Sequence, residues 1–385
     1  MSEDKDRHIH WGQQLKLSSI VTPAFIYSMS EITRQLQALR AALGTSLIVA
    51  VSACDNPDVL ARLPEDLRVG ARCTSRAEMN IVAAWKADHI YVGMPALDST
   101  SARLALGGKF RLVIDAPHQI ELLAQLRGSR TIMPITLRLN MSLVDPFIEG
   151  PRAVIGSQGM DGNELTRCLD LALAHNIPVG GLHLFGGRSC FGRLAIPIAR
   201  TLLHWRGIIE LRLGYPLATI NLGGGLDEEW AQQNHDFGAY RRVLAEFPSS
   251  VALIHEVGRS VFSSAGLFAT RVIVVKRVGG QRYAICDGGL VQAFLLTKAS
   301  GPSWRSRPAL LRRGSEVLPL TPCEARGEGT VILGATAGTE DVFGGVVEHL
   351  EAGDLVLFCQ AGAYAQAYSP VNYLGYSQAS CYVCT

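Results

Sequence analysis

The chain has few charged residues and no long apolar run. Of its 385 residues, 18% are charged and 48% are apolar, against about 25% charged in an average globular protein. This balance favours extensive burial. No apolar stretch approaches the roughly 18 residues of a membrane-spanning helix, and none follows the charged residues 1–7 as in a secretory signal. We therefore expect a cytoplasmic protein with no membrane segment.

Basic clusters and repeated metal-binding cysteine pairs are also missing. The formal net charge is only +2, and no Lys/Arg stripe runs along the sequence, which argues against nucleic acid as a partner. Most of the nine cysteines lie inside apolar runs, as buried free thiols do. Cys381 and Cys384 form a Cys-x-x-Cys pair without a second pair at matching spacing. We therefore expect no metal site.

Short apolar runs alternate with amphipathic stretches over residues 24–265. Strands are predicted at 24–27, 47–51, 69–73, 90–92, 112–114, 135–139, 181–185, 219–222 and 252–255. This alternation is typical of a parallel α/β barrel or a doubly wound sheet, and the pattern alone does not choose between them. From residue 266 the pattern becomes mostly β, with strands predicted at 270–275, 283–286, 317–320, 330–333, 355–359 and 373–376.

A helix is predicted over residues 30–42, with Ile32, Leu36, Leu39 and Leu43 on one face. Ser30 is its expected N-cap. Together these patterns predict three parts: an N-terminal segment (1–23) packing with the C-terminal β domain, an α/β domain (24–265) and a mostly β domain (266–385).

Two short segments suggest chemistry at the ends of late strands in the α/β domain. The triplet Gly223, Gly224 and Gly225 follows a predicted strand, where backbone N–H groups can approach a phosphate closely. Tight turns explain many such triplets as well. Glu256 ends the last predicted strand, and an isolated charge there would be costly without a partner. Arg259 is a candidate partner, in an ordinary structural ion pair.

Several motifs, in order, make the chain resemble the fold-type III pyridoxal phosphate (PLP) decarboxylases, the family of diaminopimelate, ornithine and lysine decarboxylases. The matching segments are Thr-Pro-x-x-x-Tyr at 22–27, Arg-Leu-Asn at 138–140, Gly-Leu-His-Leu-Phe at 181–185, Glu-Val-Gly-Arg at 256–259, Cys-Asp-Gly-Gly at 286–289 and Gly-Ala-Tyr at 362–364. The resemblance covers nearly the whole chain. It implies a (β/α)8 TIM barrel of the alanine racemase type followed by a C-terminal β-barrel or sandwich domain.

The resemblance also implies roles for individual residues. Glu256 would bond the pyridine nitrogen of PLP, which strengthens the ring as an electron sink. The phosphate would lie near Gly223, Gly224, Gly225, Gly258, Arg259 and Tyr364. The substrate or dimer site would include Arg138, Asp341 and the position of Ala337. A head-to-tail homodimer with shared active sites is implied, binding a small anionic or amino-acid-like ligand.

The departures from the family pattern fall at positions that bind the cofactor or take part in the reaction in the family. Ser52 stands where the family has the lysine that carries PLP as a Schiff base, and a hydroxyl cannot form an imine. Arg72 stands where the family has an acid near that lysine. Phe185 replaces the ring-stacking His, Arg188 replaces a phosphate-binding Ser, and Ala337 replaces a Cys donated across the dimer. If Arg72 and Arg188 both face the barrel mouth, they would form an anion-binding cup; exposed arginines are the alternative.

No other lysine substitutes for the missing one by position. Two lie in the N-terminal segment, one in a predicted helix, one in a turn before a strand and two in the β domain: Lys5, Lys16, Lys86, Lys109, Lys276 and Lys298. PLP is therefore expected to bind without a covalent lysine bond, or not at all.

Four functional readings remain open at this stage. The chain is an atypical decarboxylase-like lyase that takes PLP non-covalently, or as a preformed adduct with an amino acid. Alternatively, Ser52, Arg72 and Arg188 bind another anionic substrate and Glu256 acts as a general base. A third reading is a catalytically inactive paralogue that serves as a dimer or partner-binding scaffold. The last is that Ser52 was engineered from lysine, which Arg72 and Ala337 argue against.

Overall fold

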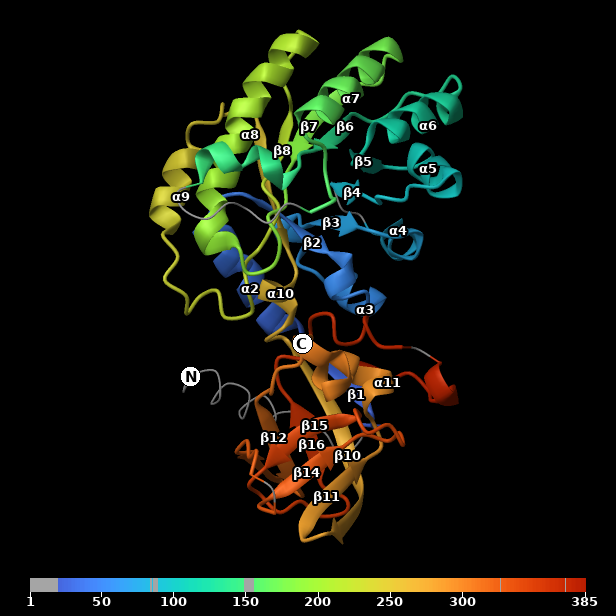
Figure 1. The fold of residues 1–385 in the computed structure, drawn as a ribbon, viewed down its shortest axis with the longest axis vertical. Coiled ribbons are helices and arrows are strands. Elements are labelled where there is room, and N and C mark those ends of the chain that lie inside the picture. The colour runs from blue at the N-terminus through green and yellow to red at the C-terminus, as the bar shows by residue number, and fades with distance from the viewer. Residues whose placement is uncertain (1–19, 84, 86–88, 149–155, 326, 371) are drawn as a thin grey trace. The chain divides into compact units, whose positions relative to one another are not determined.

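A computed structural model describes residues 20–83, 85, 89–148, 156–325, 327–370 and 372–385 (Figure 1). The described part of the chain divides into two compact units, residues 33–260 and residues 20–32 with 261–385. Lys5, Lys16, Lys86 and nearly all of the predicted N-terminal segment lie outside the described residues. No helix in the described part is long and apolar enough to cross a membrane.

The first unit is a closed barrel of parallel strands surrounded by helices (Figure 1), which confirms the predicted TIM barrel. Its strands are β2 (Ser46–Ala50), β3 (Gly70–Cys73), β4 (Ile90–Val92), β5 (Phe110–Ile114), β6 (Ile135–Arg138), β7 (Val179–His183), β8 (Thr219–Asn221) and β9 (Ala252–Val257). The ring closes where β9 pairs with β2. The helices are α2 (Met29–Leu43), α3 (Pro57–Leu60), α4 (Arg76–Ala83), α5 (Ser99–Leu106), α6 (Pro117–Arg127), α7 (Gly162–Ala174), α8 (Phe191–Leu213), α9 (Phe237–Leu244) and α10 (Arg259–Phe262).

Inward-facing side chains fill the middle of the barrel. Ile48, Tyr91, Val113 and Ile254 come from β2, β4, β5 and β9 and form one buried cluster. Because side chains alternate between the two faces of a strand, residues two positions on point into the same lumen. The carboxyl end of the barrel is where enzymes with this fold build their sites.

Helix α2 has the apolar face that its sequence predicts. Ile32, Leu36, Leu39 and Leu43 are all completely buried. The expected N-cap, however, is wrong by two residues. The helix begins at Met29, and the Ser28 hydroxyl accepts the Glu31 N–H at 3.2 Å, which is the side-chain bond of an N-cap residue.

The second unit is a nine-stranded mixed sheet in the part of the chain described. It consists of β1 (Ala24–Ser28), β10 (Gly266–Val278), β11 (Gln281–Cys286), β12 (Ala309–Arg313), β13 (Glu316–Pro319), β14 (Thr330–Leu333), β15 (Val342–Val346), β16 (Leu355–Phe358) and β17 (Ser380–Cys384), with the short helix α11 (Leu290–Ala293). The mostly β character expected after residue 266 is confirmed.

Strand β1 forms where the sequence predicts it but belongs to this second sheet. It pairs antiparallel with β10 and parallel with β17, so the range 24–265 placed it in the wrong domain. All five of its residues are buried. A strand that is apolar on both faces does not reveal its partner, and here both partners lie more than 230 residues away in sequence.

One other local prediction fails in the β domain. Residues 373–376 are not a strand: Tyr373–Gly375 form a 3-10 turn in which Leu374 has φ +54°. Cys381 and Cys384 lie in β17, and neither forms a disulfide with a described residue. Three positions apart on a strand, they point to opposite faces, which excludes a local disulfide or a shared metal ion.

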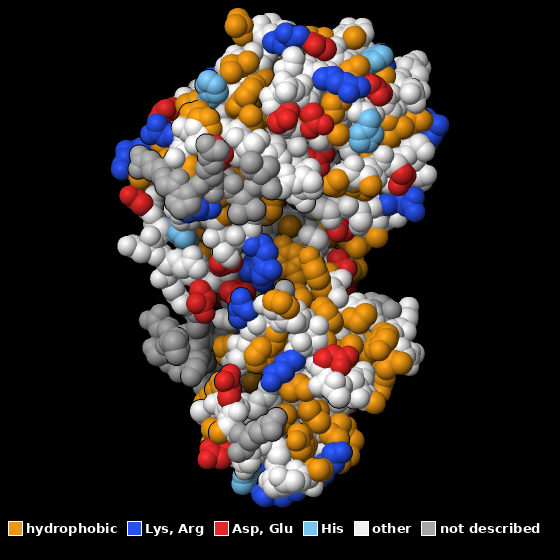
Figure 2. All heavy atoms as spheres, in the orientation of Figure 1, with side chains coloured by type: hydrophobic (Ala, Val, Ile, Leu, Met, Phe, Trp, Pro, Cys, Tyr) orange, Lys and Arg blue, Asp and Glu red, His pale blue; other side chains and the backbone are white. Residues whose placement is uncertain are grey.

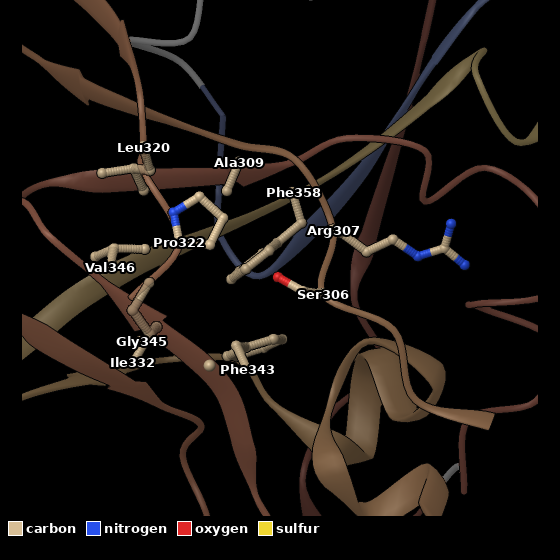
Figure 3. Close-up of a pocket in the computed structure, with 11 residues that line it drawn as sticks. Ser306, Arg307, Ala309, Leu320, Pro322, Ile332, Phe343, Gly345, Val346 and Phe358 are labelled. Carbon is tan, nitrogen blue, oxygen red and sulfur yellow. The ribbon is translucent and has the colours of Figure 1, made fainter. Parts of the chain in front are cut away.

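A small hollow lies inside this sheet domain (Figure 3). Leu320, Pro322, Val346 and the stacked rings of Phe343 and Phe358 surround it, and Arg307 extends away from it. Its volume of about 20 Å³ leaves room for about one water molecule. It is too small for a substrate.

His255 lies on the outer side of the barrel, where it bonds to two hydroxyl groups. It points away from the lumen, as expected from its position next to Glu256. Its Nδ1 lies 2.7 Å from the Thr45 hydroxyl and its Nε2 lies 2.7 Å from the Tyr240 hydroxyl. Burial lowers the pKa of His255 to about 3. The imidazole is therefore neutral in the folded protein at pH 7.

This buried imidazole makes the barrel sensitive to acid. The folded pKa lies below the ordinary value of about 6.5. The contribution of neutral His255 to the unfolding free energy is therefore fully present above pH 6.5 and is lost as the pH falls toward 3. The slope is about 1.4 kcal/mol per pH unit. His255→Gln should reduce the loss in unfolding free energy between pH 7 and pH 5 by about 2 kcal/mol, measured by urea denaturation. His118→Gln, at an exposed position, should leave the slope unchanged; equal slopes for wild type and H255Q would contradict the assignment.

Candidate active site

Three side chains converge on one carboxylate oxygen at the carboxyl end of the barrel. Glu256 Oε1 lies 3.2 Å from Arg72 Nε, 3.3 Å from His183 Nε2 and 3.0 Å from the donating Asn221 Nδ2. These residues come from β9, β3, β7 and β8. The sequence predicted Glu256 and Arg72 as site residues but proposed Arg259 as the partner of the carboxylate.

Arg259 is not the partner of Glu256. Its Nη1 lies 3.6 Å from Glu228 Oε2. Arg72 takes the role instead because Arg72 is on the inner face of β3 and only 5% exposed. Its guanidinium also donates to the carbonyls of Cys73 at 2.5 Å and Gly93 at 3.3 Å, so the charge is fixed in place.

Burial and neighbouring groups shift the pKa values of Glu256 and His183. Burial alone would raise the pKa of Glu256, but His183, Arg72 and Asn221 outweigh it and hold the pKa of this carboxyl well below its ordinary value. Burial lowers the pKa of His183, although Glu256 opposes this. The site thus contains a carboxylate beside a guanidinium and a buried imidazole.

The second oxygen of Glu256 is open to a further donor. Oε2 has no hydrogen-bond partner among the described residues, and 14% of the side-chain surface of Glu256 is exposed. His183, by contrast, is 1% exposed, and its Nδ1 is buried without a partner in the described part of the chain. Glu256 is therefore the group that can accept a bond from a ligand.

Arg138 belongs to a second ion pair at the same end. Its Nη1 lies 3.5 Å from Asp115 Oδ2, and its Nη2 donates to Gln158. Sequence reasoning missed Asp115 and Asn221. Both are polar residues at the ends of buried strands, a signal that could have been used for the whole barrel mouth.

The loops after β7 and β8 contain the predicted phosphate-facing residues. Gly223 has φ +67°, and a Cβ there would lie 2.4 Å from the Leu184 carbonyl oxygen. A Cβ at Gly224 would lie 2.5 Å from the Glu256 carbonyl oxygen. Chain packing alone thus requires these glycines. The N–H groups of Gly224 and Gly225 nevertheless have no acceptor among the described residues.

The remaining predicted positions of this unit lie around the mouth. Ser52 is half-buried in a 3-10 turn, Val51–Ala53, directly after β2, and its hydroxyl has no hydrogen bond within the described chain. Phe185 is half-buried after β7, whereas Arg188 is exposed. Arg72 is buried and lies beside Glu256, whereas Arg188 is exposed, so the two do not form the anion-binding cup that the sequence left open.

Three of the predicted site residues belong to the β domain: Asp341, Ala337 and Tyr364. The Asp341 carboxylate accepts the N–H groups of Leu290 at 2.7 Å and Thr336 at 3.0 Å, and the Thr336 hydroxyl at 2.8 Å. These bonds give Asp341 a structural role in joining α11 to the loop before β15. Ala337 in that loop is exposed, and Tyr364 is half-buried with φ +65°. Substrate contacts for Asp341 and Ala337 stay predictions.

Comparisons with known proteins agree with this architecture. The model of the pyridoxal-binding domain of pyridoxal-dependent decarboxylases matches residues 29–263. The 2-[(L-alanin-3-ylcarbamoyl)methyl]-2-hydroxybutanedioate decarboxylase of Staphylococcus aureus is 25% identical, covering 94% of each chain. Diaminopimelate decarboxylase of Vibrio cholerae is 25% identical over 92% of this chain and 86% of its own.

A solved structure shows the same fold at lower identity. Lysine/ornithine decarboxylase from Vibrio vulnificus, complexed with putrescine, superposes with a TM-score of 0.78 at 20% identity, covering 98% of both chains. This likeness concerns the fold alone.

Proposed function

Because the chain belongs to the pyridoxal-dependent decarboxylase family, we propose that it binds PLP, alone or already joined to an amino acid, without a covalent bond to the protein. The site is the carboxyl end of the barrel. The substrate class is amino-acid-like, and the activity is that of an atypical carboxy-lyase. The observation that carries the proposal is the state of Glu256. Its Oε1 accepts a hydrogen bond from Asn221 and lies within 3.3 Å of Arg72 and His183, whereas its Oε2 is open.

Glu256 suits the nitrogen end of the cofactor. Its depressed pKa keeps it ionised at pH 7, so Oε2 can accept a bond from a protonated ring nitrogen and keep that proton in place. A hydrogen bond from Asn221 and the nearby charge of Arg72 hold the carboxylate at Oε1. When bound, PLP supplies an electron sink for an attached amino acid.

The glycine loop suits the phosphate end. The unpaired N–H groups of Gly224 and Gly225 are donors for phosphate oxygens. Gly258 and Arg259 follow β9 at the same end of the barrel, and Arg259 would add positive charge. Phe185 has a ring that can stack on a pyridine.

No amine in the described barrel replaces the missing lysine. Ser52 offers a hydroxyl, which cannot condense with an aldehyde to form an imine. Lys109 precedes β5 at the opposite end of that strand and donates to the Trp85 carbonyl. The residues therefore fit PLP as a non-covalent ligand and do not fit it as a lysine-linked group.

The test compares PLP with two relatives that each lack one feature. Pyridoxine phosphate has no aldehyde and pyridoxal has no phosphate. If the protein holds the ring and the phosphate but not the aldehyde, calorimetry should give PLP and pyridoxine phosphate dissociation constants within a few-fold of each other. Pyridoxal should bind at least tenfold more weakly, a difference of about 1.4 kcal/mol.

Two results would contradict the proposal. A strict need for the aldehyde would mean that another amine forms a covalent bond. Failure of PLP and pyridoxine phosphate to bind at all would favour the inactive scaffold that the sequence left open. The predicted head-to-tail homodimer belongs to the same proposal, and light scattering of the full chain checks it.

A further inference from the structure

A cavity lies at the amino end of the barrel, at the other end of the strands from Glu256. It has a volume of about 320 Å³, and its polar lining residues are Arg111, Thr136, Tyr215 and Thr219. The apolar lining comes from Met133, Pro134, Pro178, Val179, Pro216 and Ala218. The amino ends of β5 to β8 surround it, so it is built entirely from the barrel unit.

The strand register turns the polar groups of this cavity toward the lumen. Arg111 pairs with Tyr91, and Thr136 pairs with Val113, both of which belong to the central buried cluster. Paired residues of parallel neighbours point to the same side. Thr219 pairs with Gly181 next along the ring, and its hydroxyl fills the place that a side chain at Gly181 would take.

Arg111 has no counter-charge. It forms no ion pair or hydrogen bond with any described residue, and its guanidinium lies 6.0 Å from the centre of the Tyr91 ring. Tyr91 is fully buried, and its hydroxyl has no partner in the described chain. Arg72 and Arg138 at the other end are both paired with carboxylates. A partly buried, unpaired guanidinium is costly unless an anion satisfies it.

The side chains that line the cavity favour one class of anion, a carboxylate without an amino group. No Asp or Glu lines the cavity, so the ammonium of an amino acid would find no partner there. One guanidinium suits a carboxylate, which it can bind through two parallel hydrogen bonds. The volume and the apolar walls are those of a small-molecule pocket with a few orienting polar groups.

From this geometry we propose that the amino end of the barrel binds a small carboxylate with an apolar tail and no amino group. Arg111 takes the carboxylate, the Thr136 and Thr219 hydroxyls orient it, and Met133 and the prolines cover the tail. Tyr215, 40% exposed, forms the rim, where its hydroxyl accepts the Val179 N–H at 3.1 Å. This site does not depend on the PLP proposal, because it uses none of the same residues.

The test is calorimetric titration of the full chain with hexanoate and, as a matched probe of opposite charge, hexylamine. Hexanoate should bind saturably and hexylamine should not. Arg111→Gln should weaken hexanoate at least tenfold, and Thr219→Val, which removes a hydroxyl at nearly constant volume, should weaken it several-fold. Arg103→Gln, at an exposed position on α5, should bind as wild type does.

Thermal unfolding without ligand shows whether each variant is folded. The absence of saturable hexanoate binding to the wild type would overturn the proposal. Equal hexanoate affinity of folded R111Q and wild type would overturn it as well, because binding would then occur elsewhere.

Discussion

Ser52→Lys is expected to give the barrel mouth a covalent bond to PLP that the wild type does not form. Position 52 lies in the turn after β2, two residues beyond Ala50, the strand residue that is paired with Arg72. A lysine amine there can condense with the aldehyde to an imine with loss of water, a bond that the serine hydroxyl cannot form. Borohydride reduction followed by denaturing mass spectrometry should add one reduced cofactor per chain.

The matched control is Ser46→Lys, an exposed position at the start of the same strand. It should stay unlabelled, as should the wild type. If folded S52K also stays unlabelled in saturating PLP, position 52 does not face the aldehyde, and the correspondence with the lysine of the family is wrong.

Glu256→Gln is expected to destabilise the barrel by about 3 kcal/mol or more. The substitution leaves the buried Arg72 charge without its carboxylate, and breaking one side of a buried pair costs about 3–5 kcal/mol. Arg72 keeps its bonds to the carbonyls of Cys73 and Gly93 in the variant. We therefore expect a loss of unfolding free energy near the lower end of this range. Urea denaturation at pH 7 measures it.

A double variant separates the ion pair from other effects. Arg72→Met combined with Glu256→Gln removes both charges, so its loss should be smaller than the sum of the two single losses. Glu121→Gln is the control: its partner Arg167 is 3.6 Å away and both side chains are exposed, so its loss should be below about 1 kcal/mol. Additive losses at Arg72 and Glu256 would contradict a coupled pair.

The sequence predicted the fold better than the contacts within the site. Alternating apolar runs gave the barrel strands within a few residues, because burial of a parallel strand leaves a plain apolar signal. The pairing of β1 with β10 and β17 was not predictable, since strand pairing depends on residues far apart in the chain. Strands β12, β15 and β17 were missed; β15 contains Gly344 and Gly345, which weaken a strand signal.

At the site, the resemblance identified the altered positions but not what Arg72 does. A residue on the inner face of one strand meets residues of other strands only when the ring closes, so its bond to Glu256 across the barrel mouth has no local signal. The choice of Arg259 as partner came from closeness in sequence. The same reason explains why Asn221 and Asp115 were missed.

The most direct test of non-covalent cofactor binding is mass spectrometry of the PLP-loaded wild type under native and denaturing conditions. Native spectra should show one PLP per chain. After borohydride reduction, denaturing spectra should show the unmodified chain mass. A reduced cofactor that stays on the wild-type chain under denaturing conditions, or native spectra without PLP, would contradict the account.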